Sequence, residues 1–346
     1  MASSLEREIH EQPDVLRRLV VGQMPAVRRV VDRLRKKPPR FLVIAARGTS
    51  DNAAVYAKYA FTVYNRVPVV LAAPSIITLY DSPPDMSESL VIGISQSGRG
   101  LDVCAVVEAG RKQGAQTLAI TNDGVSALAD AADDVILLEA GEEKSVAATK
   151  TYTTELTAIA MLTACWTGSG EMLSELDALP GWMDEALGQE PASQAIAGSL
   201  ADQQQMLVVG RGYNFATSLE IALKLKELAY VLAHPYSAAD VRHGPIAIVE
   251  KGFPVLVIAP TGKTLADLAA LASELLAREA SVAVITNDDA LRARCPLAAR
   301  LPAAVSEWLS PIVAVIPGQL VAFHLAKLKG FDVDHPRGLR KVTITV

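Results

Sequence analysis

The stretch FLVIAARGTS at residues 41–50 decides the fold, because a short apolar run passes directly into Arg-Gly-Thr-Ser and then into a segment of helical period. A second stretch, MLVVGRG at 206–212, repeats the apolar run, and its Arg211 lies 164 residues after Arg47. Repetition at a fixed separation is the mark of a duplicated structural unit. The sequence therefore predicts two copies of one unit.

Further apolar runs carry this pattern through the first half of the chain. They are VPVVLA at 67–72, SLVIGIS at 89–95, TLAITN at 117–122 and VILLEA at 135–140. Helical segments are expected from about 51 to 64 and up to about Gly114. Buried apolar strands that alternate with helices are typical of a parallel sheet covered on both faces.

The second half keeps this register. VIAPTG at 257–262 matches GISQSG at 93–98 at the separation of 164, and VAVITND at 282–288 matches TLAITND at 117–123 with one residue inserted. We therefore expect an α/β fold of two tandem flavodoxin-like, three-layer αβα domains with parallel sheets. In such sheets ligands bind at the carboxyl ends of the strands. Residues 168–195 are expected to be a polar linker that carries one helix.

Composition excludes several classes of protein. Of 346 residues, 33 are Lys or Arg and 38 are Asp or Glu, and this acidic balance argues against a nucleic-acid partner. The three cysteines form no CxxC pair, which argues against a zinc site or a disulfide framework and favours a cytoplasmic location. A polar N-terminus and the lack of about 20 continuous apolar residues give no sign of a secretion signal or a membrane partner.

Hydroxyl side chains gather at two predicted strand-to-helix turns of the first half: Thr49 and Ser50 at one, and Ser95 and Ser97 at the other. Helix N-termini with hydroxyl donors bind phosphate well. The alternative is ordinary helix capping, which also favours Ser and Thr. The second half lacks most of these hydroxyls, so we expect one small anionic ligand, bound by the first half.

Three regions of the second half offer groups for chemistry. Glu220, Lys224 and Glu227 share one stripe of a helix predicted over about 215–232, either as a solvated salt-bridge face or as a base beside an ammonium. His243 is expected just before an apolar strand, as a structural or a catalytic histidine. Lys341 follows a Pro/Gly turn and is either a surface lysine or part of a site.

Six motifs in order resemble the tandem sugar-isomerase (SIS) family, in particular the isomerase half of glucosamine-6-phosphate synthase. They are GTS at 48–50, ISQSG at 94–98, SVAATKTYTTEL at 145–156, ALKLKELAY at 222–230, RHGPIAI at 242–248 and the DVDHPRGL tail with its lysine. TLYDSPPDM and GEEKSVAATKTYT look more like the stand-alone branch, which includes SIS-type glucosamine-6-phosphate deaminases.

The resemblance implies a first domain over 25–167 that binds phosphate, a second over 195–335 that carries the base helix, and a tail over 336–346 that completes the site. The family's phosphate and sugar contacts match Thr49, Ser50, Ser95, Gln96 and Ser97, and Val146 matches a position whose backbone meets the sugar.

The catalytic positions are carried over in the same way. Glu227 matches the base that moves a proton between C1 and C2, and Lys224 matches the lysine that assists it. His243 matches a ring-opening histidine that reaches in from a neighbouring subunit, which implies a homodimer with a shared site. Lys341 matches a lysine that forms an imine with the open-chain ketose.

Departures from the family shape the functional expectation. Gly100 replaces a phosphate-binding threonine, for which the charge of Arg99 could compensate, and Ala148 replaces a serine near the sugar. We expect no glutaminase domain, and hence conversion of glucosamine 6-phosphate to fructose 6-phosphate and ammonia, with no metal or other cofactor required. The alternatives are plain aldose–ketose isomerisation and a non-catalytic phosphosugar-binding regulator.

Overall fold

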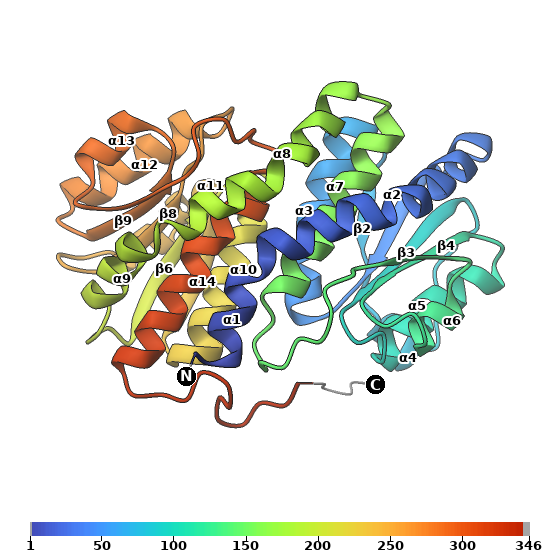
Figure 1. The fold of residues 1–346 in the computed structure, drawn as a ribbon, viewed down its shortest axis with the longest axis horizontal. Helices are drawn as coiled ribbons and strands as arrows, with labels where there is room; N and C mark the ends of the chain where they lie inside the picture. Colours follow the sequence, from blue (N-terminus) through green and yellow to red (C-terminus); the bar gives the residue numbers. More distant parts are fainter. Residues whose placement is uncertain (1, 342–346) are drawn as a thin grey trace. The chain divides into compact units, whose positions relative to one another are not determined.

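The computed structural model describes residues 2–341, which divide into two compact units (Figure 1). The first-sheet unit consists of residues 14–143 and 150–178 and also includes Arg340 and Lys341. The second-sheet unit consists of residues 2–13, 144–149 and 179–339. The division is not a single cut, since the N-terminal segment and the short segment 144–149 both group with the second sheet.

Each unit contains a five-stranded parallel sheet. In the first, β1 (Phe41–Ala45), β2 (Val69–Leu71), β3 (Ser89–Ser95), β4 (Gln116–Thr121) and β5 (Asp134–Leu137) lie in the order β2-β1-β3-β4-β5. In the second, β6 (Gln205–Gly210), β7 (Leu232–Ser237), β8 (Pro254–Ile258), β9 (Ser281–Thr286) and β10 (Leu297–Arg300) lie in the order β10-β9-β8-β6-β7. Both orders are the flavodoxin-like 2-1-3-4-5 arrangement, which confirms the predicted fold class and the duplication.

Helices connect the strands of both units. In the first half of the chain they are α1 (Ser4–His10), α2 (Gln12–Lys36), α3 (Gly48–Ala60), the π-helical turn η1 (Phe61–Asn65), α4 (Ser75–Thr78), α5 (Leu101–Lys112), α6 (Ala127–Ala131) and α7 (Lys150–Thr167). In the second half they are α8 (Gly170–Leu187), α9 (Glu190–Ser199), α10 (Asn214–Ala229), α11 (Ala238–Arg242), the 3₁₀ turn η2 (Pro245–Ile248), α12 (Leu265–Ala277), α13 (Asp289–Arg294) and α14 (Ser310–Leu328).

Alternate residues of each central strand face opposite layers of helices, and both layers are apolar. In the first-sheet unit Val43 and Val91 pack against α5 and α6, whereas Leu42 and Ile92, one residue along each strand, are buried on the opposite face. In the second-sheet unit the equivalent face of β6, β8 and β9 packs against α11, α12 and α13. This two-sided burial explains why the strands read as continuous apolar runs.

The helix α14 has the length and apolar composition that could cross a membrane, but 83% of its apolar window is buried within the fold. It packs against α9 and α10 in the second-sheet unit. Gly318 allows close contact there, because a Cβ at this position would lie 2.2 Å from the Cδ1 atom of Ile221. These contacts are those of a core helix.

Two local predictions are wrong. Residues 168–195 contain α8 and the start of α9 rather than one helix, since Leu176, Leu179 and Met183 repeat at helical spacing and are fully buried. The segment after His243 is the 3₁₀ turn η2 rather than a strand, and the next strand begins only at Pro254. Its side chains are not buried on two faces, and Ile248 is half exposed, so nothing holds this segment in a sheet.

Candidate functional site

The first of the two predicted anion-binding turns follows β1. Thr49 and Ser50 occupy the first turn of α3, as expected, and Gly48 before them has a φ of 53°, which favours glycine. Ser50 is buried, and its Oγ donates a hydrogen bond of 2.7 Å to Oε1 of Glu155 on α7. A hydroxyl has a single proton, so the Ser50 proton here holds α3 to α7.

The second turn follows β3, the strand next to β1. Ser95 ends β3, and Ser97 lies four residues before the start of α5 at Leu101. Ser95 Oγ accepts from the Gly98 amide at 3.2 Å, and Ser97 Oγ accepts from the Arg99 amide at 3.3 Å. Within residues 2–341, neither hydroxyl donates to a protein acceptor, so both can donate to a bound anion.

Both turns lie at the carboxyl edge of the first sheet because β1 and β3 pair in parallel. Gln96 lies between the two serines of the second turn and is half-buried. The charged Arg99 side chain, the predicted substitute for the missing threonine at Gly100, is exposed and lies 3.6 Å from Oδ2 of Asp123. The structure thus places five predicted contact residues at two adjacent turns, and it gives Arg99 a partner of its own.

A buried charge cluster occupies α10 of the second-sheet unit. Lys224 Nζ lies 3.3 Å from Oε1 of Glu220 and 2.6 Å from Oε2 of Glu227. The side chains of Glu220 and Lys224 are 0% and 1% exposed, and that of Glu227 is 22% exposed. The alternative of a solvated salt-bridge face is therefore wrong, because this stripe points into the fold.

The cluster fixes the charge of the lysine. Burial by itself would lower the pKa of Lys224, but the carboxylates of Glu220 and Glu227 outweigh burial and leave the pKa raised above its usual 10.5. Lys224 is consequently an ammonium throughout the neutral range. A fixed cation beside a partly exposed carboxylate can steady negative charge that develops on a substrate at Glu227.

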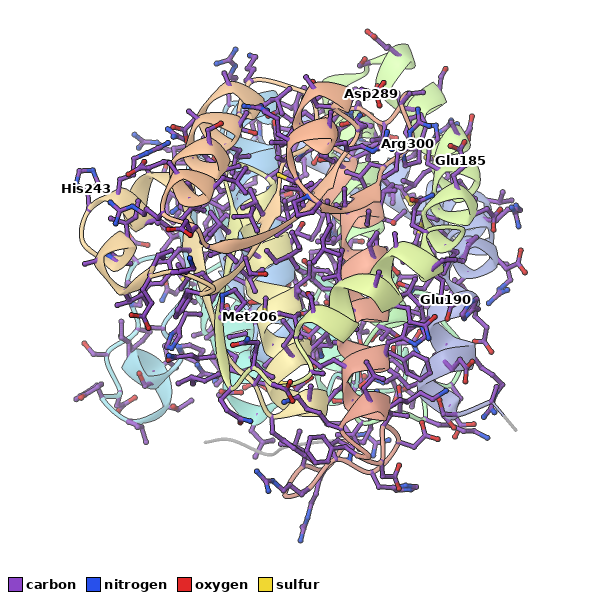
Figure 2. The ribbon with its side chains drawn as sticks, turned by 90° about the vertical axis from the view of Figure 1, so that its left-hand side faces the viewer. Glu185, Glu190, Met206, His243, Asp289 and Arg300 are labelled. Atoms are coloured by element: carbon purple, nitrogen blue, oxygen red, sulfur yellow. The ribbon has the colours of Figure 1, made fainter. Side chains whose placement is uncertain are left out.

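His243 follows the short helix α11 and caps its C-terminus, with its backbone amide donating to the Asp240 carbonyl at 3.0 Å. Its imidazole is exposed, and Figure 2 shows it pointing outward from the rim of the second-sheet unit. The neighbouring Arg242 fixes α11 to α12, since its Nη1 lies 2.7 Å from Oδ1 of Asp267. The backbone before His243 is thus anchored while its ring faces outward.

The segment that carries Val146 is held by a residue the sequence analysis missed. Glu8 on α1 is buried, and its carboxylate accepts the Ser145 amide at 3.2 Å and also the Ser145 hydroxyl. Both lie in the second-sheet unit, and Val146 follows directly. A glutamate in a short, largely polar N-terminal helix gives no local signal of this contact across 137 residues.

Lys341 is anchored in the first-sheet unit. Its Nζ lies 2.7 Å from Oε2 of Glu143, and its side chain is 25% exposed. Glu143 is buried and also accepts the amide and hydroxyl of Thr151 at 3.1 and 2.7 Å. Lys341 is thus an ion-paired residue, and Glu143 is a second partner the sequence analysis missed. Residues 342–346 of the predicted tail lie outside the described residues.

The predicted site residues therefore fall into two groups, one in each unit. Thr49, Ser50, the 95–97 turn and Lys341 belong to the first-sheet unit, and Val146, Lys224, Glu227 and His243 belong to the second-sheet unit. Among residues 2–341, no three His, Cys, Asp or Glu side chains come together as ligands for a metal ion.

The SIS domain model matches residues 35–164 and 199–329, and these ranges contain every predicted site residue except Lys341. The chain belongs to the SIS domain family. A glutamine–fructose-6-phosphate aminotransferase (isomerizing) of Pyrococcus horikoshii is 37% identical over 98% of the chain, and that match covers 57% of the relative. The corresponding enzyme of Thermococcus kodakarensis is 36% identical with the same coverage. The chain thus spans little more than half the length of these relatives.

Solved structures share the fold over nearly the whole chain. A protein of Silicibacter pomeroyi, provisionally assigned as a phosphosugar isomerase, is 32% identical with a TM-score of 0.88 and covers 96% of this chain and 100% of its own. The C-terminal domain of the glucosamine-fructose-6-phosphate aminotransferase of Francisella tularensis is 28% identical, also with a TM-score of 0.88, over 97% and 99% of the two chains.

Removal of the buried ammonium tests the cluster on α10. We expect Lys224→Met to lower the free energy of unfolding by about 3–5 kcal/mol, because it leaves a buried carboxylate without its cation. Lys226→Met on the exposed side of the same helix is the matched control and should change stability by less than about 0.5 kcal/mol. Urea unfolding measures both variants, and equal stability of the two would contradict the assignment.

Proposed function

We propose that the chain acts on an amino-hexose 6-phosphate and converts glucosamine 6-phosphate to fructose 6-phosphate and ammonia by a proton shift between C1 and C2. The observation that carries this proposal is the Lys224–Glu227 contact of 2.6 Å, in which a charged, buried ammonium adjoins a glutamate whose side chain is 22% exposed. Membership of the SIS family and the likeness to phosphosugar enzymes support a phosphorylated sugar as ligand.

Phosphate binding is the first step of the proposed reaction. The hydroxyls of Ser95 and Ser97 have protons to donate, and Thr49 and Gln96 lie at the same sheet edge. A phosphate held there contributes binding energy far from the reacting carbons, and that energy orients C1 and C2 toward the base. Ser50 would donate to the phosphate only after its hydroxyl gives up the hydrogen bond to Glu155.

Proton transfer follows once the sugar ring is open. Glu227 removes the proton from C2 and returns it at C1, while the ammonium of Lys224 stabilises the negative charge that develops on the intermediate. With an amino sugar, the product is a ketose imine, and water adds to its carbon to release ammonia and leave the ketone. Lys341 is proposed to form an imine with the open-chain ketose, which requires it to leave Glu143 and lose a proton.

His243 is proposed to open the ring from a second subunit. Its imidazole is exposed and points outward (Figure 2), an orientation that suits a group which serves the site of a neighbouring copy. The chain would then work as a homodimer with shared sites.

Plain aldose–ketose isomerisation is the second candidate, because the Glu227–Lys224 pair supports it equally well. The two reactions differ only in whether a nitrogen leaves. A regulator that only binds phosphosugar would have no use for a buried ammonium beside a partly exposed base, so we place it third.

An ammonia and ketose-phosphate assay with glucosamine 6-phosphate tests the proposal. We expect equal amounts of ammonia and fructose 6-phosphate from the natural protein. Glu227→Gln should lower turnover by at least about 100-fold, because an amide cannot accept the C2 proton, while phosphosugar binding changes little. Glu185→Gln, an exposed residue on α8 of the same unit, is the control and should keep full turnover.

The outcomes separate the candidates. Interconversion of glucose 6-phosphate and fructose 6-phosphate without ammonia from any hexosamine phosphate would favour the plain isomerase. Full turnover in Glu227→Gln would remove that residue from the mechanism.

A further inference from the structure

The two predicted anion-binding turns are joined by an ion pair that the sequence analysis did not single out. Arg47 comes directly before the Gly48–Ser50 turn, and Asp102 lies in the first turn of α5, directly after the Ser95–Gly100 turn. Arg47 Nε lies 2.6 Å from Oδ2 of Asp102. The Asp102 side chain is 0% exposed and that of Arg47 is 52% exposed. Asp102 is therefore fixed in the core, and Arg47 extends from the neighbouring turn to meet it.

The same pair recurs in the second repeat. Arg211, 164 residues after Arg47, contacts the carboxylate of Asp267. Asp267 lies in the first turn of α12, as Asp102 does in α5. The pair is therefore part of the duplicated frame rather than an accident of one surface.

In the second repeat, the turn before α12, next to the Arg211–Asp267 pair, already binds a carboxylate. The carboxylate of Glu307 accepts the backbone amides of Lys263 and Thr264 at 2.9 and 3.1 Å, and the Thr264 hydroxyl at 3.0 Å. At the repeat spacing of 164, these two amides correspond to those of Arg99 and Gly100. An anionic group thus already sits on this part of the frame in the half of the chain where the serines are missing.

We propose that the Arg47–Asp102 ion pair is the positioning element of the phosphate site in the first repeat. It holds the two turns in register, so that the hydroxyls of Ser95 and Ser97 and the backbone amide of Gly100 meet one phosphate monoester, while the Arg99 amide stays on Ser97 Oγ. The inference deepens the proposed function and rests on it for the nature of the ligand. The Gly100 amide also supplies a donor at the position where the family's threonine hydroxyl is missing.

The chemistry of the pair suits this role. A guanidinium is planar and always charged, so a fixed Nε bond sets the direction of the whole group, and a lysine cannot reproduce that. The buried Asp102 carboxylate also receives the backbone amide of Val103 at 2.9 Å, which ties the acidic partner to the start of α5. Loss of either partner frees one turn from the other without removing any atom that contacts the ligand.

Binding measurements on the full chain test the proposal. Isothermal titration with inorganic phosphate and with fructose 6-phosphate should show affinity about tenfold or more weaker in Arg47→Met and in Asp102→Asn. Arg47→Lys should recover part of the loss. Ser97→Ala removes a hydroxyl that is proposed to contact the phosphate, and its loss of affinity is the reference for one missing donor. Arg211→Met breaks the equivalent pair of the second repeat and should leave both affinities unchanged.

Stability and affinity must be compared in the same variants. Weaker phosphate binding in folded Asp102→Asn and Arg47→Met, with an unchanged affinity in Arg211→Met, supports the positioning role. Unchanged phosphate affinity in the folded first-repeat variants would overturn it, and so would an equal loss in Arg211→Met. These readouts need no turnover, so a chain that binds phosphate through this frame but converts no sugar would refute the proposed function alone.

Discussion

A fully buried ammonium is the constraint on which the proposed chemistry depends. Lys224 has almost no access to water, and the carboxylates of Glu220 and Glu227, at 3.3 and 2.6 Å from its nitrogen, keep it charged. An isolated buried charge is strongly unfavourable, so loss of any one of the three residues would leave the others with an uncompensated buried charge. Of the two glutamates only Glu227 has a partly exposed side chain, and this difference separates a structural partner from the proposed base.

Duplication gives one fold two versions of the same sheet edge, which suits the two proposed tasks of binding phosphate and moving a proton. Both repeats keep the same strand order and the same Arg–Asp pair beside the first strand. The first retains hydroxyls with protons to donate, and the second fills the equivalent backbone amides with Glu307 and presents charged groups on α10. The repeats have therefore diverged in side chains at the turns and helices, where a change leaves the apolar strands intact.

Much of the fold could be predicted from the sequence because the strands are buried on both faces. The apolar run at 89–95 has the bounds of β3, and the separation of 164 residues correctly aligned the repeats. The helices α8 and α9 were harder to predict, since their buried residues are spaced among many polar ones. The segment after His243 is apolar in sequence but turns in 3₁₀ form, because its side chains are not buried on two faces as those of a central strand are.

The candidate site was predictable only in part. Glutamate and lysine at helical spacing look alike on a solvated face and in a core, so the burial of Lys224 could not be derived from spacing. Glu143 meets Lys341 across 198 residues, and Glu8 meets Ser145 across 137. No local pattern encodes such contacts, and the helix-capping preference of Ser and Thr hides the difference between Ser50, whose proton is used within the fold, and Ser97.

Hydrogen exchange at carbon tests the central claim most directly. Incubation of the natural protein with fructose 6-phosphate in D₂O, followed by NMR of the recovered sugar phosphate, reports whether a base moves a proton between C1 and C2. The account predicts deuterium at C1 of the ketose or C2 of the aldose, and none with Glu227→Gln. Tight binding of the sugar phosphate with no deuterium in any C–H bond would contradict it.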